Sequence, residues 1–317
     1  MGQLAETLLA GVEPRFTVDA ALPGARGIGE SEEGRPIHAY EIGKGARGIS
    51  LIAGAHADEP VGPETLRILV QNADRLGVLL EEFTFRVVPH VNPDGAARNQ
   101  AWIDAWPDAE AYRSRVLREP PGRDVEFGYP DLRPENRVVS NFLAERVPYA
   151  LHMSLHGMAI AEGGMLLIEK HWVDRTVALR ERYGALLDRH IPGRHDHDRK
   201  GDKGFQYLGP GFWTTPEGSA MRAYFAERGD HEMARRFRDS SMEYVRSLGG
   251  DPLCLVTEIP LFVVPNSDPQ PGHPGAFFAV KERWADPGAL AGTQSVPLAT
   301  AMALQLDALE LGLAAIG

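Results

Sequence analysis

The chain has 317 residues, of which 43% are hydrophobic and 24% charged, a balance typical of a globular protein with a sizeable core. It carries 33 Lys and Arg against 44 Asp and Glu, a formal net charge of -11, so we expect neither nucleic acid nor an anionic membrane surface as a partner. A single cysteine, Cys254, excludes an intrachain disulfide and any Cys-rich metal site.

The location of the protein is predicted from what its sequence lacks. The first residues, Met1-Gly2-Gln3-Leu4, have neither the basic start nor the apolar run of a signal peptide. No uninterrupted apolar stretch has the length of a membrane span. We therefore expect a cytoplasmic protein. No segment resembles a linker, so residues 1–317 are predicted to form a single domain, and the sequence leaves the oligomeric state open.

The first half of the chain predicts strands that alternate with helices. Residues 27–54 indicate two strands joined by a turn at 31–36, because residues 37–42 alternate apolar and polar positions. Residues 48–54 form a short apolar run, typical of a buried central strand. Further predictions are a helix over residues 63–80, a strand over 85–89, a turn over 92–95 and a mixture of short helix and loops over 99–134.

The second half continues the same alternation. A strand over residues 149–155 is predicted to end at His156-Gly157, and the apolar residues 253–259 predict a buried strand that contains an inert Cys254 thiol. Strands that alternate with helices indicate an α/β sheet with helices on both faces. The other predicted elements are helices over residues 134–147, 173–190, 232–248 and 298–313, and a long surface loop over 191–218.

The segment after the first buried strand has the pattern of a metal site. His56 and Glu59 form a His-x-x-Glu pair between a strand and a helix, which is the edge of an open α/β sheet where ligands bind. Zinc accepts imidazole nitrogen and carboxylate oxygen, and a catalytic zinc needs three protein ligands. The alternative is a polar turn whose carboxylate lies at the start of a helix.

Spacing alone does not define such a site. His38 and Glu41 have the same spacing, but they lie within an alternating strand, where residues three apart point to opposite faces. A third ligand is expected at the end of another strand, and His156 is in that position. His152 lies on the same face of that strand but deeper in the sheet, so we expect it to be a buried, hydrogen-bonded histidine.

Hydrolysis also requires a general base. Glu258 lies near the end of an otherwise apolar strand, where burial of a charge is costly without a partner. A carboxylate near a metal site can accept the proton of the metal-activated water and pass it to a leaving amine. The alternative is a carboxylate neutralised by a lysine or by solvent.

With these residues in this order, the chain resembles the zinc carboxypeptidase family, the carboxypeptidase A-like metallopeptidases. The resemblance extends from near residue 28 to about residue 262. It implies a mixed twisted central sheet flanked by helices on both faces, zinc as the cofactor at His56, Glu59 and His156, and Glu258 as general base. It is carried by an ordered set of motifs: Ser31-x-x-Gly34-Arg35-Pro36-Ile37, His56-x-x-Glu59, Asn92-Pro93-Asp94-Gly95, Pro134-Glu135-x-Arg137, His156 and Thr257-Glu258.

The chain departs from the family at the substrate clamp. The family carries Asp-Leu-Asn-Arg-Asn-Phe-Pro, whose Asn and Arg bind the terminal carboxylate of the substrate. The corresponding stretch here is residues 122–130, with Glu126 and Phe127 in the clamp positions. Neither side chain can bind a carboxylate as Arg does. We therefore expect weak activity in the release of single C-terminal amino acids.

Three further roles follow from the resemblance. An arginine is expected to stabilise the oxyanion, with Arg98 the nearest candidate and Arg113, Arg115 and Arg118 its rivals. Arg222, beside the Gly-Ser stretch of the family's specificity pocket, is expected to bind an acidic group of the substrate, or else to point outward from a helix. A few residues upstream of that stretch, Trp213 replaces a Tyr of the family. The segment His195-Asp196-His197-Asp198 predicts a solvated loop rather than a second metal site.

The sequence therefore predicts a zinc-dependent hydrolase of a peptide or small amide substrate. A deacylase of N-acyl amino acids, similar to the succinylglutamate desuccinylase and aspartoacylase group, is the alternative within enzymes. A non-catalytic binding module with the same fold is the alternative outside them, although a binding protein would have no need of Glu258.

Overall fold

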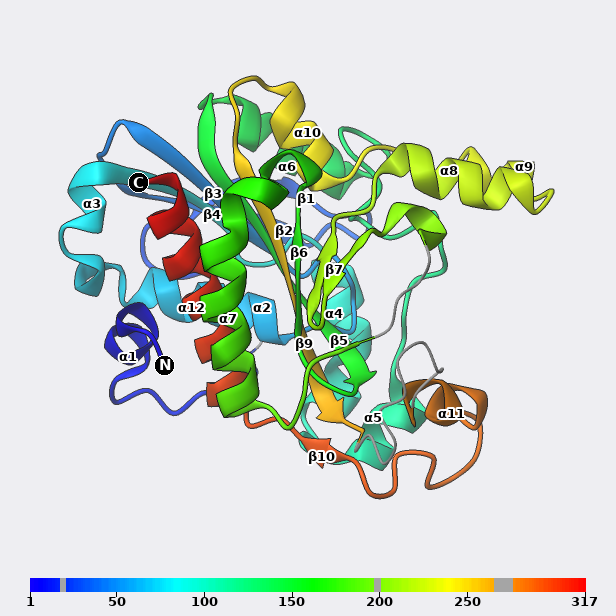
Figure 1. Cartoon of the computed structure of the whole chain (residues 1–317). Coiled ribbons are helices and arrows are strands. Elements are labelled where there is room, and N and C mark those ends of the chain that lie inside the picture. The colour runs from blue at the N-terminus through cyan, green and yellow to red at the C-terminus, as the bar shows by residue number, and fades with distance from the viewer. Residues whose placement is uncertain (18–20, 197–200, 265–275) are drawn as a thin grey trace.

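A ten-stranded mixed sheet forms the centre of this computed structural model, which describes residues 1–17, 21–196, 201–264 and 276–317 (Figure 1). The strand order is β1-β2-β4-β3-β5-β9-β6-β8-β7, with β10 paired to β9. The strands are β1 (Arg26–Glu30), β2 (Pro36–Gly43), β3 (Arg47–Ala53), β4 (Phe83–Val88), β5 (Tyr149–Ala161), β6 (Met165–Ile168), β7 (Tyr207–Gly209), β8 (Phe212–Thr214), β9 (Leu253–Val263) and β10 (Gln294–Ser295).

The four central strands, β4, β3, β5 and β9, run parallel to one another. Their residues are almost all buried, because helices cover both faces of a parallel sheet. The predicted central strand is β3, and the predicted strands at residues 85–89 and 253–259 are β4 and β9. The carboxyl ends of β3, β5 and β9 therefore meet at one edge of the sheet.

One face of the sheet is covered by four helices, α1 (Gln3–Leu9), α2 (Val61–Gln71), α7 (Val177–His190) and α12 (Leu298–Ile316), which share one hydrophobic core with the sheet. In Figure 1, α12 (red) lies beside α7 (green) along this face. By length and composition α12 could span a membrane, but 67% of its apolar window is buried inside the molecule. Its apolar surface is therefore part of the core.

The other face is covered by α6 (Pro134–Ala144) and α10 (Ser241–Ser247), whose Val139, Phe142 and Val245 pack against the sheet. Helices on both faces of a mixed sheet confirm the predicted fold class. The remaining helices are α3 (Leu79–Glu82), α4 (Pro93–Ile103), α5 (Ala109–Arg115), α8 (Gly218–Glu227), α9 (His231–Ala234) and α11 (Ala276–Glu282), with 3-10 turns η1 (Ala73–Leu76), η2 (Lys170–Thr176) and η3 (Asp202–Gly204).

Several predicted boundaries are wrong for local reasons. The predicted turn at residues 92–95 is the first turn of α4, because the Asn92 side chain accepts a hydrogen bond from the Gly95 amide and caps the helix. The predicted loop over 191–218 contains the short strands β7 and β8. The predicted helix over 63–80 ends at Gln71. The predicted helix over 232–248 is divided into α9 and α10, and Ser240 and Glu243 form a capping box at the start of α10.

Candidate active site

The loop between β3 and α2 brings His56 and Glu59 together. Gly54, with φ +74°, ends β3 in the left-handed conformation that glycine adopts without steric cost. The amide of Glu59 then donates to the carbonyl of His56 over 3.3 Å, which closes a turn. This turn places the Glu59 Oε1 atom 2.7 Å from His56 Nδ1. The predicted His-x-x-Glu pair is therefore a convergent pair of donor atoms.

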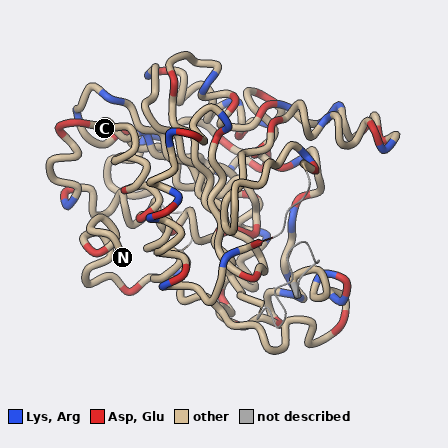
Figure 2. The backbone as a smooth tube through the Cα atoms, viewed as in Figure 1, with Lys and Arg blue, Asp and Glu red and all other residues tan. Residues whose placement is uncertain are grey.

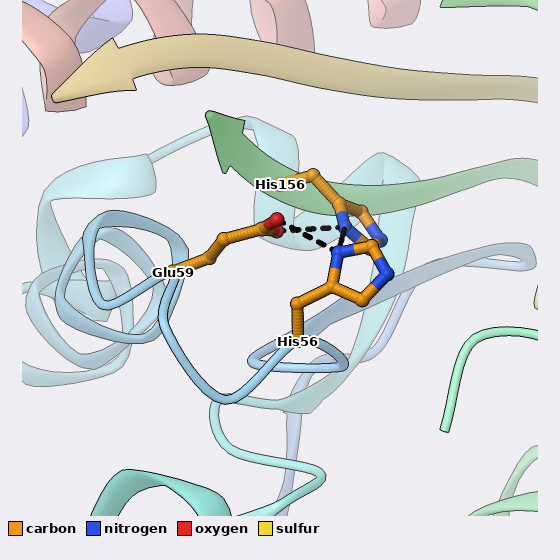
Figure 3. A group of neighbouring side chains, drawn as sticks. All are labelled: His56, Glu59 and His156. Atoms are coloured by element: carbon orange, nitrogen blue, oxygen red, sulfur yellow. Dashed lines mark hydrogen bonds and ion pairs between the residues drawn. The ribbon is translucent and has the colours of Figure 1, made fainter. Parts of the chain in front are cut away.

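The imidazole of His156 completes the cluster (Figure 3). Its Nδ1 lies 3.1 Å from Nδ1 of His56 and 2.9 Å from Oε2 of Glu59. Among the described residues, these three form the group whose donor atoms could hold a metal, all within 4.8 Å of one another. His156 was predicted at the end of its strand, but β5 continues to Ala161 because its pairing with β9 extends to Val263.

The donor set fits zinc. Two imidazole nitrogens and one carboxylate form a known catalytic zinc set, and zinc–nitrogen bonds of about 2.0–2.1 Å place tetrahedral ligand atoms about 3.3 Å apart. The separations of 2.7–3.1 Å here are close to that value. Burial raises the pKa of Glu59, but the charges of His56 and His156 and their hydrogen bonds to the carboxylate together lower it more, so the net pKa lies well below its usual value. An ionised carboxylate beside two imidazoles suits a dication.

Glu258 lies beside His156 on the neighbouring strand. The two residues are register partners in the parallel pair β5 and β9, so their side chains lie on the same face of the sheet. Burial and the nearby Glu59 carboxylate raise the pKa of Glu258 to about 8. A carboxyl group whose pKa is close to the neutral range can both accept and donate a proton. Glu258 therefore lies beside a residue that could hold a metal.

The arginine at this cluster is Arg118, one of the three predicted rivals. Its guanidinium lies 3.3 Å from Glu59 Oε1 and 3.2 Å from Asp58 Oδ2, and the side chain is 49% exposed. Arg98 is not brought to the cluster: it pairs with Glu33 on the outside of α4 and lies 4.0 Å from Glu119. The other two rivals are also engaged elsewhere, Arg113 with Glu110 and Arg115 with the carbonyl of Ala101.

Glu126 has a role that the sequence did not indicate. It was placed at a clamp position, yet its side chain is buried beneath the metal cluster and accepts a hydrogen bond from His156 Nε2 over 3.1 Å. Burial raises the pKa of Glu126, but the hydrogen bonds from His156 and the Ser241 amide and the charges of His156 and His56 together lower it more, so the net pKa is lowered. The signal available in the sequence was a carboxylate between the apolar residues Val125 and Phe127.

A cavity of about 740 Å³ opens beside the cluster and is lined by His56, Glu59, Arg118 and Glu258. Apolar side chains form another part of the lining, and the charged residues Glu119, Asp124, Lys203 and Lys281 complete it. Phe127 belongs to the apolar part and packs edge-on against Phe237, with ring centroids 5.9 Å apart. The other apolar residues of the lining include Met158, Met165, Phe205, Met221 and Phe225.

The remaining predicted positions lie away from the cluster. Arg222 is on α8, 41% exposed and 4.0 Å from Asp239, whereas its neighbour Met221 lines the cavity. His195 is buried and its Nδ1 lies 3.0 Å from Glu162, so this part of the segment is not a solvated loop. Asp196 accepts a hydrogen bond from Tyr207, and His197 and Asp198 lie outside the described residues. His152 and Cys254 are buried, as predicted.

Comparison with known proteins supports the same family. A sequence model described as zinc carboxypeptidase matches residues 25–132. No curated protein matches the chain. Among solved structures, bovine thrombin-activatable fibrinolysis inhibitor in complex with tick carboxypeptidase inhibitor superposes with a TM-score of 0.52 at 16% identity, covering 92% of this chain and 89% of that one.

Two further structures have the same fold. Carboxypeptidase A from Helicoverpa armigera superposes with a TM-score of 0.51 at 13% identity, covering 98% of this chain and 71% of that one. A metallo-carboxypeptidase from Burkholderia cenocepacia gives 0.50 at 15% identity, covering 93% of this chain and 66% of that one. Residues 25–132 therefore match the zinc carboxypeptidase family, and the described chain has the fold of the metallocarboxypeptidases, as the sequence predicted.

Proposed function

We propose that this protein is a zinc-dependent hydrolase of a peptide or peptide-like amide bond. The observation that carries the proposal is the meeting of three donor atoms, from His56, Glu59 and His156, at the edge of a cavity that Glu258 and Arg118 also line. A binding protein has no need of a second carboxylate with a raised pKa beside such a cluster. The fold and the family match support the same class of reaction.

Each residue of the candidate site has a defined role in this proposal. His56, Glu59 and His156 would hold zinc, which when bound acts as a Lewis acid and activates water. Glu258 accepts a proton during attack on the carbonyl carbon and delivers a proton to the departing amine. Arg118 directs its guanidinium into the cavity beside Glu59 and would stabilise the negative charge that develops on the carbonyl oxygen.

The test of this function is the variant Glu258→Gln. The amide preserves the shape of the side chain but cannot accept a proton, so we expect hydrolysis to fall by ~10²–10⁴-fold while zinc content and fold are retained. Activity is measured on a panel of peptides and N-acyl amino acids, with and without a chelator, and zinc by elemental analysis. His56→Ala and His156→Ala are the companion variants and should lose zinc.

Three outcomes contradict the proposal. Glu258→Gln with a near-wild-type rate would remove the general base from the mechanism. Full zinc content in the double variant of His56 and His156 would remove the metal site. If the protein hydrolyses only N-acyl amino acids, it is a deacylase and not a hydrolase of peptides.

A further inference from the structure

A line of buried polar side chains crosses the sheet beneath the metal cluster. Because side chains alternate along a strand, His152, Ser154 and His156 of β5 lie on one face, and Ser50 of β3 is the register partner of His152. This face is the one that α10 covers, and Ser241 is the first residue of α10. All five side chains and that of Glu126 are at most 4% exposed, although the surrounding core is apolar.

The side chains contact one another in sequence. Ser50 Oγ lies 2.8 Å from His152 Nδ1, and His152 Nε2 lies 3.2 Å from Ser241 Oγ. The Ser241 hydroxyl donates to Glu126 Oε1 over 3.0 Å, and the Ser241 amide donates to the same oxygen over 3.2 Å. Glu126 Oε2 then lies 3.1 Å from His156 Nε2. The line therefore ends on a residue of the metal cluster.

The direction of every hydrogen bond follows from the carboxylate. An ionised Glu126 can only accept, so His156 Nε2 and the Ser241 hydroxyl must both donate to it. Because the Ser241 proton is committed to Glu126, its oxygen accepts from His152 Nε2. His152 Nδ1 is then unprotonated and accepts from the Ser50 hydroxyl. Ser154 Oγ, 2.8 Å from His156 Nε2, shares the same N–H as a second acceptor.

The contact of Glu126 with Nε2 of His156 determines which of the two imidazole nitrogens is available to a metal ion. Two carboxylates contact the His156 imidazole, Glu126 at Nε2 and Glu59 at Nδ1, and an ion bound between His156 and Glu59 would take the place of the proton on Nδ1. The remaining proton would then be on Nε2, facing Glu126, and the Nδ1 lone pair would face the metal ion between His56 and Glu59. A ligand histidine held by a carboxylate through its other nitrogen is oriented and made more basic.

We infer that Glu126 is a positioning residue of the metal site, held by Ser241 and His152, and that it fixes the tautomer and orientation of His156 for binding zinc. Both carboxylate oxygens are needed, because Oε2 accepts from His156 while Oε1 accepts two hydrogen bonds from Ser241. An amide has one acceptor oxygen and would turn a donor toward one of these groups. The inference rests on the proposed zinc site. It gives Glu126, the residue at the clamp position, a role in metal binding instead of substrate binding.

The experiment measures the zinc dissociation constant by competition with a chelator of known affinity. In Glu126→Gln we expect zinc binding to weaken by ~10–100-fold. The matched control is Glu162→Gln, because Glu162 also holds a buried histidine, with Oε2 3.0 Å from His195 Nδ1, but lies on no ligand of the cluster. The control should bind zinc like the wild type.

Ser241→Ala separates positioning from folding. It leaves Glu126 and its bond to the Ser241 amide in place but removes the hydroxyl that donates to Glu126 and accepts from His152, so we expect a loss of zinc affinity of about 2–10-fold. In the double variant with Glu126→Gln that loss should vanish, because Ser241 acts through Glu126. If Glu126→Gln does not fold, Ser241→Ala alone decides: an unchanged dissociation constant overturns the inference.

The outcomes distinguish the inference from the proposed function. Wild-type protein that binds no zinc would refute both. Wild-type protein that binds zinc, together with Glu126→Gln of equal affinity or with a loss equal to that of Glu162→Gln, would overturn the role of Glu126 alone. Additive losses in the double variant would show that Ser241 acts by another route.

Discussion

Arg118 is held at the cluster by Asp58, the residue that precedes Glu59. Asp58 is 2% exposed and its Oδ2 lies 3.2 Å from the Arg118 guanidinium, while the hydroxyl of Tyr112 donates to the same oxygen over 3.4 Å. Asp58 therefore fixes the loop that carries Arg118 against the loop that carries Glu59. The buried Asp58 carboxylate, rather than the backbone of Arg118, therefore fixes the position of the guanidinium at the cavity.

We expect Arg118→Ala to lower kcat by about 10²–10³-fold, the usual cost of removing a group that stabilises an oxyanion. Arg98→Ala is the matched control, because Arg98 is similarly exposed at 42% but pairs with Glu33 outside the cluster. Steady-state rates of the two variants on one peptide substrate decide the matter. Equal rates in both variants, or a larger loss in Arg98→Ala, would exclude Arg118 from this role.

Phe127 and Glu126 leave the cavity without the clamp of the family. The Phe127 ring is part of the apolar lining, and Glu126 is turned away from the cavity toward His156. A carboxylate that loses its water against the Phe127 ring gains no compensating hydrogen bond at that position. We expect an amidated peptide to be cleaved at least as well as the same peptide with a free C-terminus. A clear preference for the free acid in kcat/KM would contradict this and direct mutagenesis to Arg118.

At the scale of the elements, the metal-site loop depends on how closely α2 approaches the sheet. A Cβ atom on Gly62 would lie 2.3 Å from the carbonyl oxygen of Leu155 in β5 and 3.0 Å from the Cβ of Ala53. Only glycine permits this contact between the first turn of α2 and the strand that carries His156. The same contact determines the distance of Glu59, three residues earlier, from His156.

Gly62→Ala should therefore separate α2 from β5. We expect it to lower the free energy of unfolding by about 1–3 kcal/mol, as overpacking in a core does, and to weaken zinc binding. Gly27→Ala is the control, because a Cβ at Gly27 meets no atom within 4 Å. Urea denaturation and zinc titration of both variants test the prediction. A Gly62→Ala protein with wild-type stability and affinity would show that α2 moves without cost.

The elements also explain how much of the site the sequence could predict. His56, Glu59, His156 and Glu258 follow or lie in strands with clear apolar runs, so local patterns located them. Arg118 and Glu126 lie between α5 and α6, in a segment without helical or strand periodicity. Contacts that are distant in sequence determine that segment, such as Arg133 with Glu119 at 2.7 Å, and no local pattern encodes them.

At the scale of the whole molecule, charge is dispersed and the core is continuous. Lys and Arg lie among Asp and Glu along the entire described chain instead of gathering in one region (Figure 2). The largest cluster of buried residues extends from α1 through the sheet to α12, so the two ends of the described chain pack against the same core. The three residues that could hold a metal join a loop near residue 56 to a strand near residue 156.

Zinc should therefore stabilise the whole fold. Its proposed ligands come together only when β3, α2 and β5 are assembled, so the metal binds the folded state and not the unfolded chain. At a zinc concentration of about 1,000 times the dissociation constant, the free energy of unfolding should rise by about 4 kcal/mol. For a chain of this size that corresponds to a Tm shift on the order of 5–10 °C.

The shift is measured by thermal unfolding of the chelated and the zinc-loaded protein, with His156→Ala as the control. That variant lacks one proposed ligand, so its Tm in the chelated state should change little when zinc is added. Glu258→Gln keeps all three proposed ligands and should show the wild-type shift, which separates the effect of the metal from that of catalysis. A Tm that zinc leaves unchanged in the wild type would mean that the cluster holds no metal in solution, and an equal shift in His156→Ala would place the ion at another site.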